Sequence, residues 1–115
     1  MKQLTITPAE LTIVRIILAR FVPEREVRAF GSRITGPVKK FSDLDLVVMG
    51  EAPLSASILT DLEEGFRESD LPFKVDVVDW ATTQETFRRI IEQDSVVVQG
   101  GKEQRKAQIE TTSPE

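Results

Sequence analysis

Two aspartates, Asp43 and Asp45, are separated by a single residue in the segment DLDLVVM at residues 43–49. The segment alternates polar and apolar residues and then becomes β-branched, which predicts a strand with one polar end. Because side chains alternate along a strand, both carboxylates would point to one face, with their Cα atoms roughly 7 Å apart. Such a pair can bind one divalent cation or two, or it can be solvated at the exposed end of an ordinary strand.

A third carboxylate occurs in the segment FKVDVVDW at residues 73–80, where Asp76 lies between two valines. If this strand lies beside the first, Asp76 comes next to the other two carboxylates, and a bound cation would compensate the cost of burying its charge. Asp79 has the opposite parity and is the alternative third ligand, although a role at the end of the strand suits it better. The sequence thus predicts a site for a hard cation on two adjacent strands.

The segment GSRITGPVKK, which begins at Gly31, precedes the first aspartate pair. Glycine permits a sharp turn and a close approach of an anion to main-chain amides, and the hydroxyl of Ser32 adds a hydrogen bond. Arg33 is the best phosphate ligand among the nearby cations because a guanidinium can bind two oxygens at once. Lys39 and Lys40 are more simply interpreted as solvated. The segment is therefore either a phosphate-binding turn or a plain hairpin connection.

The composition excludes several classes of chemistry. The chain has no His, Cys or Tyr, so a Ser-His-Asp triad, a thiol nucleophile and a zinc site of imidazoles or thiolates are all absent. Oxygen ligands remain, and they suit Mg²⁺, Mn²⁺ or Ca²⁺. A net charge of −4 does not favour a long nucleic acid as partner. No apolar run is long enough to cross a bilayer, so we expect no membrane partner. Without cysteine there is no sign of an oxidising compartment, and the expected location is the cytoplasm.

The elements that must position these groups form one α/β domain with a mixed sheet in the order αββαβα, at residues 1–100. A capping box of Thr7 and Glu10 opens the first helix, and a second capping box, of Thr82 and Glu85, opens the last. Residues 101–115 are polar, and we expect a mobile tail. The expected elements are helices at 8–22, 55–69 and 82–93 and strands at 26–30, 43–49 and 73–80, with 95–99 as a last short strand or a packed extension.

The pattern G-S-x10-D-x-D, formed by Gly31, Ser32, Asp43 and Asp45, resembles that of the minimal nucleotidyltransferases of the DNA polymerase beta superfamily. The resemblance covers nearly the whole folded part and implies the nucleotidyltransferase fold. It also implies that Asp43, Asp45 and Asp76 are catalytic and hold two Mg²⁺ ions, with Mn²⁺ as an alternative. The Gly-Ser turn would then grip the β- and γ-phosphates of ATP or another nucleoside triphosphate.

Within this superfamily, the chain is most similar to single-domain members encoded beside a helical HEPN protein in toxin–antitoxin pairs. That similarity implies transfer of AMP from ATP to a hydroxyl of the HEPN protein, which neutralises it. Two other hypotheses remain open at this stage. One is a non-catalytic subunit that binds a nucleotide or a partner, since a chain this small offers little surface for a second substrate. The other is an unrelated α/β domain with a solvated strand. Exposed helix positions could also support a homo-oligomer.

Overall fold

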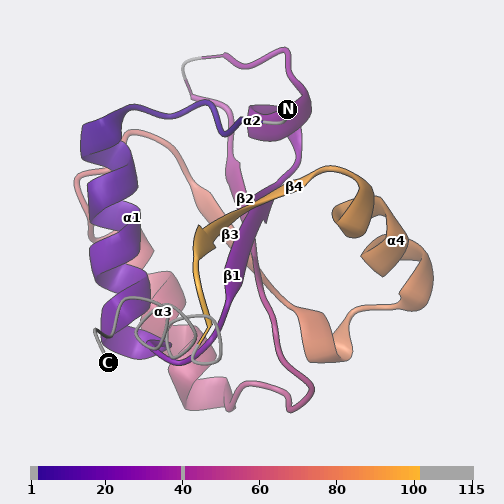
Figure 1. Ribbon diagram of the computed structural model, residues 1–115. Coiled ribbons are helices and arrows are strands. Elements are labelled where there is room, and N and C mark those ends of the chain that lie inside the picture. The colour runs from indigo at the N-terminus through magenta and orange to yellow at the C-terminus, as the bar shows by residue number, and fades with distance from the viewer. Residues whose placement is uncertain (1–2, 40, 102–115) are drawn as a thin grey trace, which may run out of the picture.

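A mixed sheet forms the centre of the computed structural model, which describes residues 3–39 and 41–101 (Figure 1). The strand order is β3-β2-β1-β4, and only β2 and β3 run parallel. β1 pairs antiparallel with both β2 and β4, whereas α3 lies in the connection between the parallel strands β2 and β3, as such a crossover requires. The strands are β1 (Val27–Phe30), β2 (Leu44–Val48), β3 (Val75–Asp79) and β4 (Ser95–Gln99).

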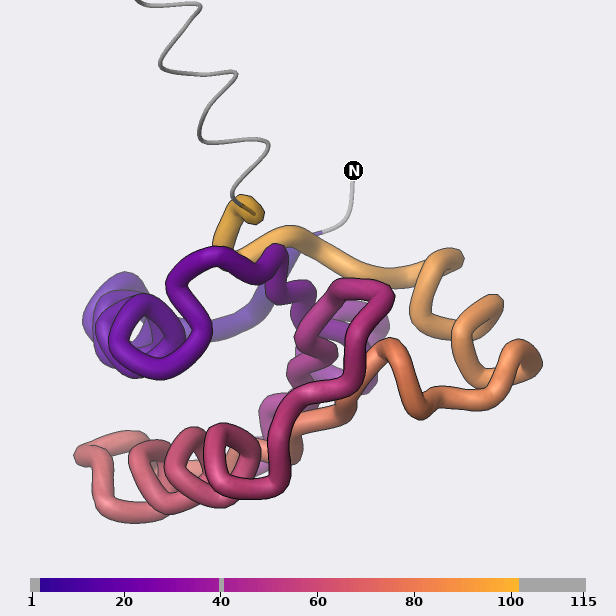
Figure 2. The backbone as a smooth tube through the Cα atoms, turned by 90° about the horizontal axis from the view of Figure 1, so that it is seen from below, coloured from indigo at the N-terminus to yellow at the C-terminus, as the bar shows by residue number. Residues whose placement is uncertain are grey.

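Helices cover both faces of the sheet. Figure 2 shows α1 and α3 together on one side and α4 on the other. None of the described helices is both long and apolar enough to cross a membrane. The helices are α1 (Pro8–Phe21), α2 (Ser32–Thr35), α3 (Ala56–Arg67) and α4 (Glu85–Gln93), with a 3₁₀ turn η1 (Trp80–Thr82) after β3.

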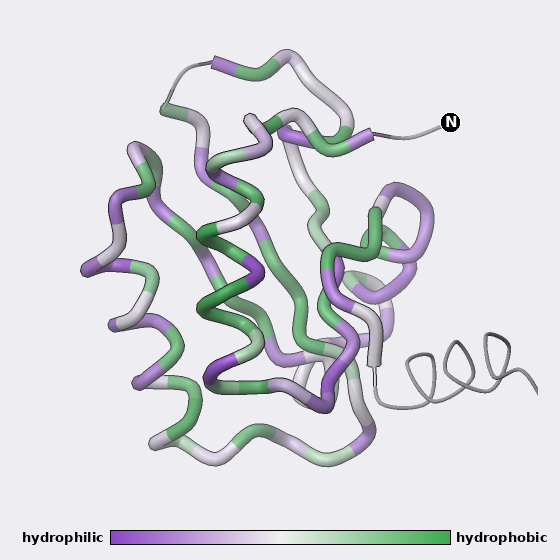
Figure 3. The backbone as a smooth tube through the Cα atoms, turned by 60° about the vertical axis from the view of Figure 1, so that its left-hand side comes forward, coloured by the Kyte–Doolittle hydropathy of each residue, from purple (hydrophilic) through white to green (hydrophobic). Residues whose placement is uncertain are grey.

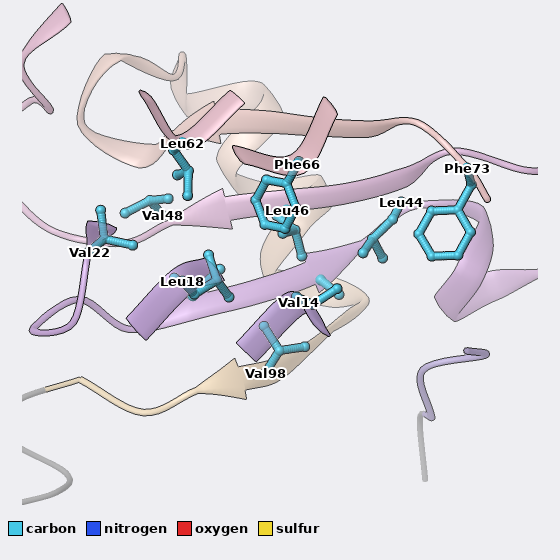
Figure 4. Packing of buried hydrophobic residues seen from close by; sticks show 12 residues of the cluster. Val14, Leu18, Val22, Leu44, Leu46, Val48, Leu62, Phe66, Phe73 and Val98 are labelled. Atoms are coloured by element: carbon cyan, nitrogen blue, oxygen red, sulfur yellow. The ribbon is translucent and has the colours of Figure 1, made fainter. Parts of the chain in front are cut away.

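The main core lies between the sheet and the pair of helices α1 and α3. Leu18 of α1 and Leu62 of α3 are fully buried against β2, whose Leu44 and Leu46 are also fully buried (Figure 4). A smaller cluster under α4 contains Phe30, Val47 and Ile91. Apolar residues follow one another along the strands, whereas polar and apolar residues alternate along the helices (Figure 3). Along β2, Leu44 and Leu46 point into the main core and Val47 points into the smaller cluster, because side chains alternate between the two faces of a strand.

The sequence predicted most of these elements to within two residues. Thr7 and Glu10 form the expected capping box, with hydrogen bonds of 3.1 and 2.9 Å, and α1 begins at Pro8. The segment 95–99 is a true strand that pairs with β1. The short helix α2, directly after β1, was not predicted, because four residues carry no measurable helical period.

The second predicted capping box is wrong. The hydroxyls of Thr82 and Thr83 donate to the Asp79 carbonyl oxygen at 3.2 and 2.7 Å, and Thr82 ends the 3₁₀ turn. The helix begins instead at Glu85, with Gln84 as its N-cap and no side-chain cap. The hydroxyl of Thr82 is therefore engaged by the end of β3 before α4 can begin.

The boundary between domain and tail also changes. Gly101, which the sequence assigned to the tail, is buried, and a Cβ atom there would lie 3.2 Å from Glu26 N. The chain is thus packed against the turn before β1 through residue 101. Residues 102–115, for which we expected a mobile tail, lie outside the described residues.

Candidate active site

The predicted phosphate-binding turn joins β1 to α2. Gly31 has φ +85° and ψ −156°, a backbone conformation that is available almost only to glycine. The amides of Ile34 and Thr35 donate to the Gly31 carbonyl oxygen at 3.0 and 3.1 Å and so close the turn around Ser32. A Cβ atom at Gly31 would overlap with Oδ2 of Asp45 and lie 3.2 Å from its Cγ. The turn is therefore in direct contact with a predicted metal ligand.

The carboxylates come together through the register of the sheet. Asp45 and Asp76 are direct partners in the parallel pair of β2 and β3, and Asp45 is also the partner of Phe30 on β1. Asp43 lies one residue before β2 and is exposed. The leucines on either side of Asp45 are fully buried toward α1 and α3, so Asp45 and Asp43 point to the opposite face. The structure thus places the predicted third carboxylate, Asp76, directly beside Asp45, with Asp43 on the same face of β2.

The charge of this cluster affects Asp45 most. Burial raises the pKa of the Asp45 carboxyl above its ordinary value, and the charges of Asp76 and Asp43 raise it further. Both causes disfavour the ionised form of Asp45. A cation bound between the carboxylates would favour that ionised form, because its positive charge offsets their mutual repulsion. The donor set consists only of carboxylate oxygens, which are the ligands that Mg²⁺ and Mn²⁺ prefer. The residues therefore fit a hard divalent cation.

The third carboxylate already has a cationic partner. Nζ of Lys74 lies 3.4 Å from Oδ1 of Asp76. Within the described part of the chain, no three His, Cys, Asp or Glu side chains converge as a ready-made metal site. The sequence reasoning missed Lys74, although its position directly before β3 and two residues before Asp76 was a usable signal. A cation that binds Asp76 would compete with this ammonium group.

Arg33, predicted to bind phosphate, has another position. Its side chain is buried, at 4% exposure. Nε donates to the Ser42 carbonyl oxygen and Nη1 to that of Thr5, each at 2.9 Å, and the guanidinium lies 4.0 Å from the centre of the Phe73 ring. Through these contacts, Arg33 connects the N-terminal segment before α1 with the loops that precede β2 and β3. We therefore leave Arg33 out of the phosphate-binding group and correct its role to a structural one.

The other candidates are also separated by the structure. Asp79 is buried at the far end of β3, opposite Val48, and accepts hydrogen bonds from the amides of Leu54 (2.8 Å) and Ala81 (3.2 Å). Asp79 is thus a structural residue, and Asp76 is the better third carboxylate. Lys39 is exposed, in agreement with a solvated side chain, and Lys40 lies outside the described residues.

Most of the chain, and not only its motif, is similar to known proteins. The profile of the polymerase beta nucleotidyltransferase family matches residues 20–104. The chain belongs to this family. It is 53% identical over 97 residues to a probable protein adenylyltransferase, MntA, from Haemophilus influenzae, covering 84% of this chain and 85% of the relative. The fold class and the superfamily that the sequence motif implied are confirmed.

Solved structures share the fold. A toxin–antitoxin crystal structure with AMP-PNP superposes with a TM-score of 0.67 at 19% identity, covering 84% of this chain and 78% of that chain. An MntA–HepT toxin–antitoxin structure gives a TM-score of 0.63 at 17% identity, covering 88% and 79%. A complex of a tri-AMPylated Shewanella oneidensis HEPN toxin with an MNT antitoxin gives 0.62 at 19% identity, covering 90% and 81%. At these identities the likeness establishes the nucleotidyltransferase fold.

Proposed function

We propose that this protein is an Mg²⁺-dependent adenylyltransferase that transfers AMP from ATP to a hydroxyl of a helical HEPN-type protein and thereby acts as its antitoxin. The observation that carries the proposal is the contact between Gly31 and Asp45, which joins a phosphate turn to a carboxylate group on adjacent strands. The 53% identity to a protein named as a probable protein adenylyltransferase supports the chemistry. The HEPN toxins in the solved complexes of the same fold support the partner.

Each part of the site has a role in the proposed reaction. Asp43, Asp45 and Asp76 would hold two Mg²⁺ ions, or Mn²⁺, which when bound neutralise the triphosphate and lower the pKa of the acceptor hydroxyl. The turn at Gly31 and Ser32 would bind the β- and γ-phosphates through main-chain amides and a hydroxyl. Asp45 lies between the turn and Asp76 on β3, so it would connect the phosphate-binding part of the site to the part that receives the acceptor.

The transfer itself is an in-line displacement at the α-phosphorus. The acceptor oxygen forms a bond to that phosphorus while the bond to the β-phosphate oxygen breaks, and pyrophosphate leaves. The proton of the hydroxyl passes to Asp76, which lies on the edge strand β3. No histidine is needed as base, in agreement with its absence from the sequence.

The proposal is tested by label transfer. The purified chain is incubated with [α-³²P]ATP, Mg²⁺ and the HEPN-type protein encoded by the neighbouring gene, beside the Asp45→Asn variant. We expect label on the partner with the wild type and none with the variant. A partner that stays unlabelled, or that is labelled equally by both, would refute the proposal.

The ion pair between Lys74 and Asp76 favours a second, non-catalytic function, because the ammonium group of Lys74 balances the charge of the third carboxylate. In that case the chain neutralises its partner by forming a complex, with no catalysis. The two functions separate in a growth assay in which the partner is toxic. A complex-forming subunit protects cells as well with Asp43→Asn and Asp45→Asn as without them, whereas an enzyme loses protection with both changes.

A further inference from the structure

The outer edge of β3 is bordered by a groove with a volume of about 430 Å³. The groove lies between α3 and β3, and four consecutive residues of the strand segment are among its lining, so it runs along the strand edge. Asp76 is among the lining residues, so the groove reaches the strand position that carries the third carboxylate. The lining includes Glu63 of α3 and Lys74, Val75, Asp76 and Val77 of the strand segment.

The main chain along this edge is available for pairing. The Leu44 amide donates to the Lys74 carbonyl oxygen at 2.9 Å, so Lys74 and, two residues on, Asp76 direct their main-chain groups toward β2. By alternation, Val75 and Val77 direct theirs outward. Among residues 3–39 and 41–101, no loop or side chain forms a hydrogen bond with these outward groups. An open edge of this kind is a template for another strand.

The opposite edge of the sheet differs. On β4, the Val98 carbonyl oxygen accepts a hydrogen bond from Nε of Arg15 at 3.0 Å, so a side chain of α1 covers part of that edge. The pairing of β4 with β1 is also irregular near Val27. A bulge and a covering side chain are common means of preventing strand addition. The edge beside the carboxylates therefore lacks the protection that the remote edge has.

We propose that an extended segment of the acceptor protein binds as an additional strand on β3, with its hydroxyl-bearing residue beside Asp76. This inference rests on the proposed function and specifies how that function selects its acceptor. A residue opposite Asp76 on an added strand points to the same face as Asp76, which brings its hydroxyl to the proton-accepting carboxylate. Main-chain hydrogen bonds supply affinity in this mode, which suits a chain with little surface beyond its site.

A second copy of this chain is a poorer occupant. In a two-fold pairing of two β3 strands, Val75 of one copy lies opposite Val77 of the other, and each Asp76 faces its own equivalent. Like charges directly opposite one another on neighbouring strands are destabilising. The acceptor segment carries no such penalty.

The test uses two tryptophan variants of adjacent residues on α3. Glu63 and Glu64 are both exposed, but Glu63 lines the β3 groove and Glu64 lines the separate groove between α1 and α3. We expect Glu63→Trp to lower kcat/KM for the HEPN-type acceptor about tenfold or more while KM for ATP stays within about twofold, because only the strand-addition site is blocked. Glu64→Trp, the matched control, should behave like the wild type.

Hydrogen–deuterium exchange of the unmodified chain gives a second readout that does not depend on folding of a variant. With the acceptor and AMP-PNP present, the amides of Val75 and Val77 should become protected. If the wild type labels the acceptor but neither the exchange nor Glu63→Trp shows an effect, strand addition is refuted and the proposed function stands. If the wild type transfers no label, both proposals fail. A dimer that Glu63→Trp abolishes, with acceptor labelling unchanged, would assign the edge to self-association and refute the inference.

Discussion

Replacing Gly31 with alanine tests the geometry of the site most directly. The residue has φ +85° and ψ −156°, and holding a side chain in that region costs about 1–3 kcal/mol. For a domain of this size, such a loss lowers the melting temperature by about 5–20 °C. In addition, the new Cβ would overlap with Oδ2 of Asp45, so the carboxylate must move away from the turn.

The consequence for activity exceeds that for stability. A displacement of about 1 Å in a reacting group lowers the rate of an enzyme about 100-fold. We therefore expect Gly31→Ala to reduce AMP transfer about 100-fold or more, measured with labelled ATP at a temperature where circular dichroism shows a folded protein. The loss should appear mainly in kcat, because Asp45 acts on the reacting groups.

Gly36 supplies the matched control. It has φ +64° and ψ +174°, so alanine meets the same kind of backbone strain there, but no atom lies within 4 Å of the added Cβ. Gly36→Ala should lose stability to a similar extent and retain most of its activity. If both variants transfer AMP at the same rate, the contact between Gly31 and Asp45 has no catalytic importance, and the reasoning about the site is refuted.

Three further predictions concern charged residues. In metal-free buffer, Asp45→Asn should raise the melting temperature by a few degrees at pH 7. The pKa of Asp45 in the folded protein is above the ordinary 3.8, so the folded state binds the proton more tightly than the unfolded state does. The wild type is therefore most stable below pH 3.8, where the carboxyl is protonated in both states, and loses this contribution as the pH rises through the folded-state pKa. Arg33→Ala should lower the free energy of unfolding by about 2–4 kcal/mol, measured by urea denaturation, because two carbonyl oxygens and the Phe73 ring lose their partner. Asp79→Ala should cost about 1–3 kcal/mol and leave AMP transfer intact below the melting temperature, whereas Asp76→Asn should abolish transfer at nearly unchanged stability.

Each of these predictions has a contradicting result. For Asp45→Asn, the difference from the wild type should disappear below the ordinary carboxyl pKa, where both side chains are neutral, and a difference that persists in acid would contradict the electrostatic cause. For Arg33→Ala, unchanged stability with a raised KM for ATP would restore the phosphate-binding role. For the pair on β3, loss of transfer with Asp79→Ala but not with Asp76→Asn would exchange the two assignments.

The sequence determined the features that depend on local spacing. Hydrophobic periodicity and a capping box located α1, and alternation located β2 with Leu44 and Leu46 facing the core. The same alternation placed Asp43 and Asp45 on one face, because side-chain direction repeats every two residues in any strand. The superfamily followed from the spacing of Gly31 and this aspartate pair, and the family profile confirmed it.

Only the tertiary structure decided what depends on contacts between distant segments. The choice between Asp76 and Asp79 required the register of β3 against β2, which no local pattern encodes. Arg33 looked like a phosphate ligand because it follows a Gly-Ser turn, but its guanidinium is buried by three loops that are far apart in the sequence. The charge pattern shows which groups could carry the chemistry. The packing of the chain determines which of them face the same point.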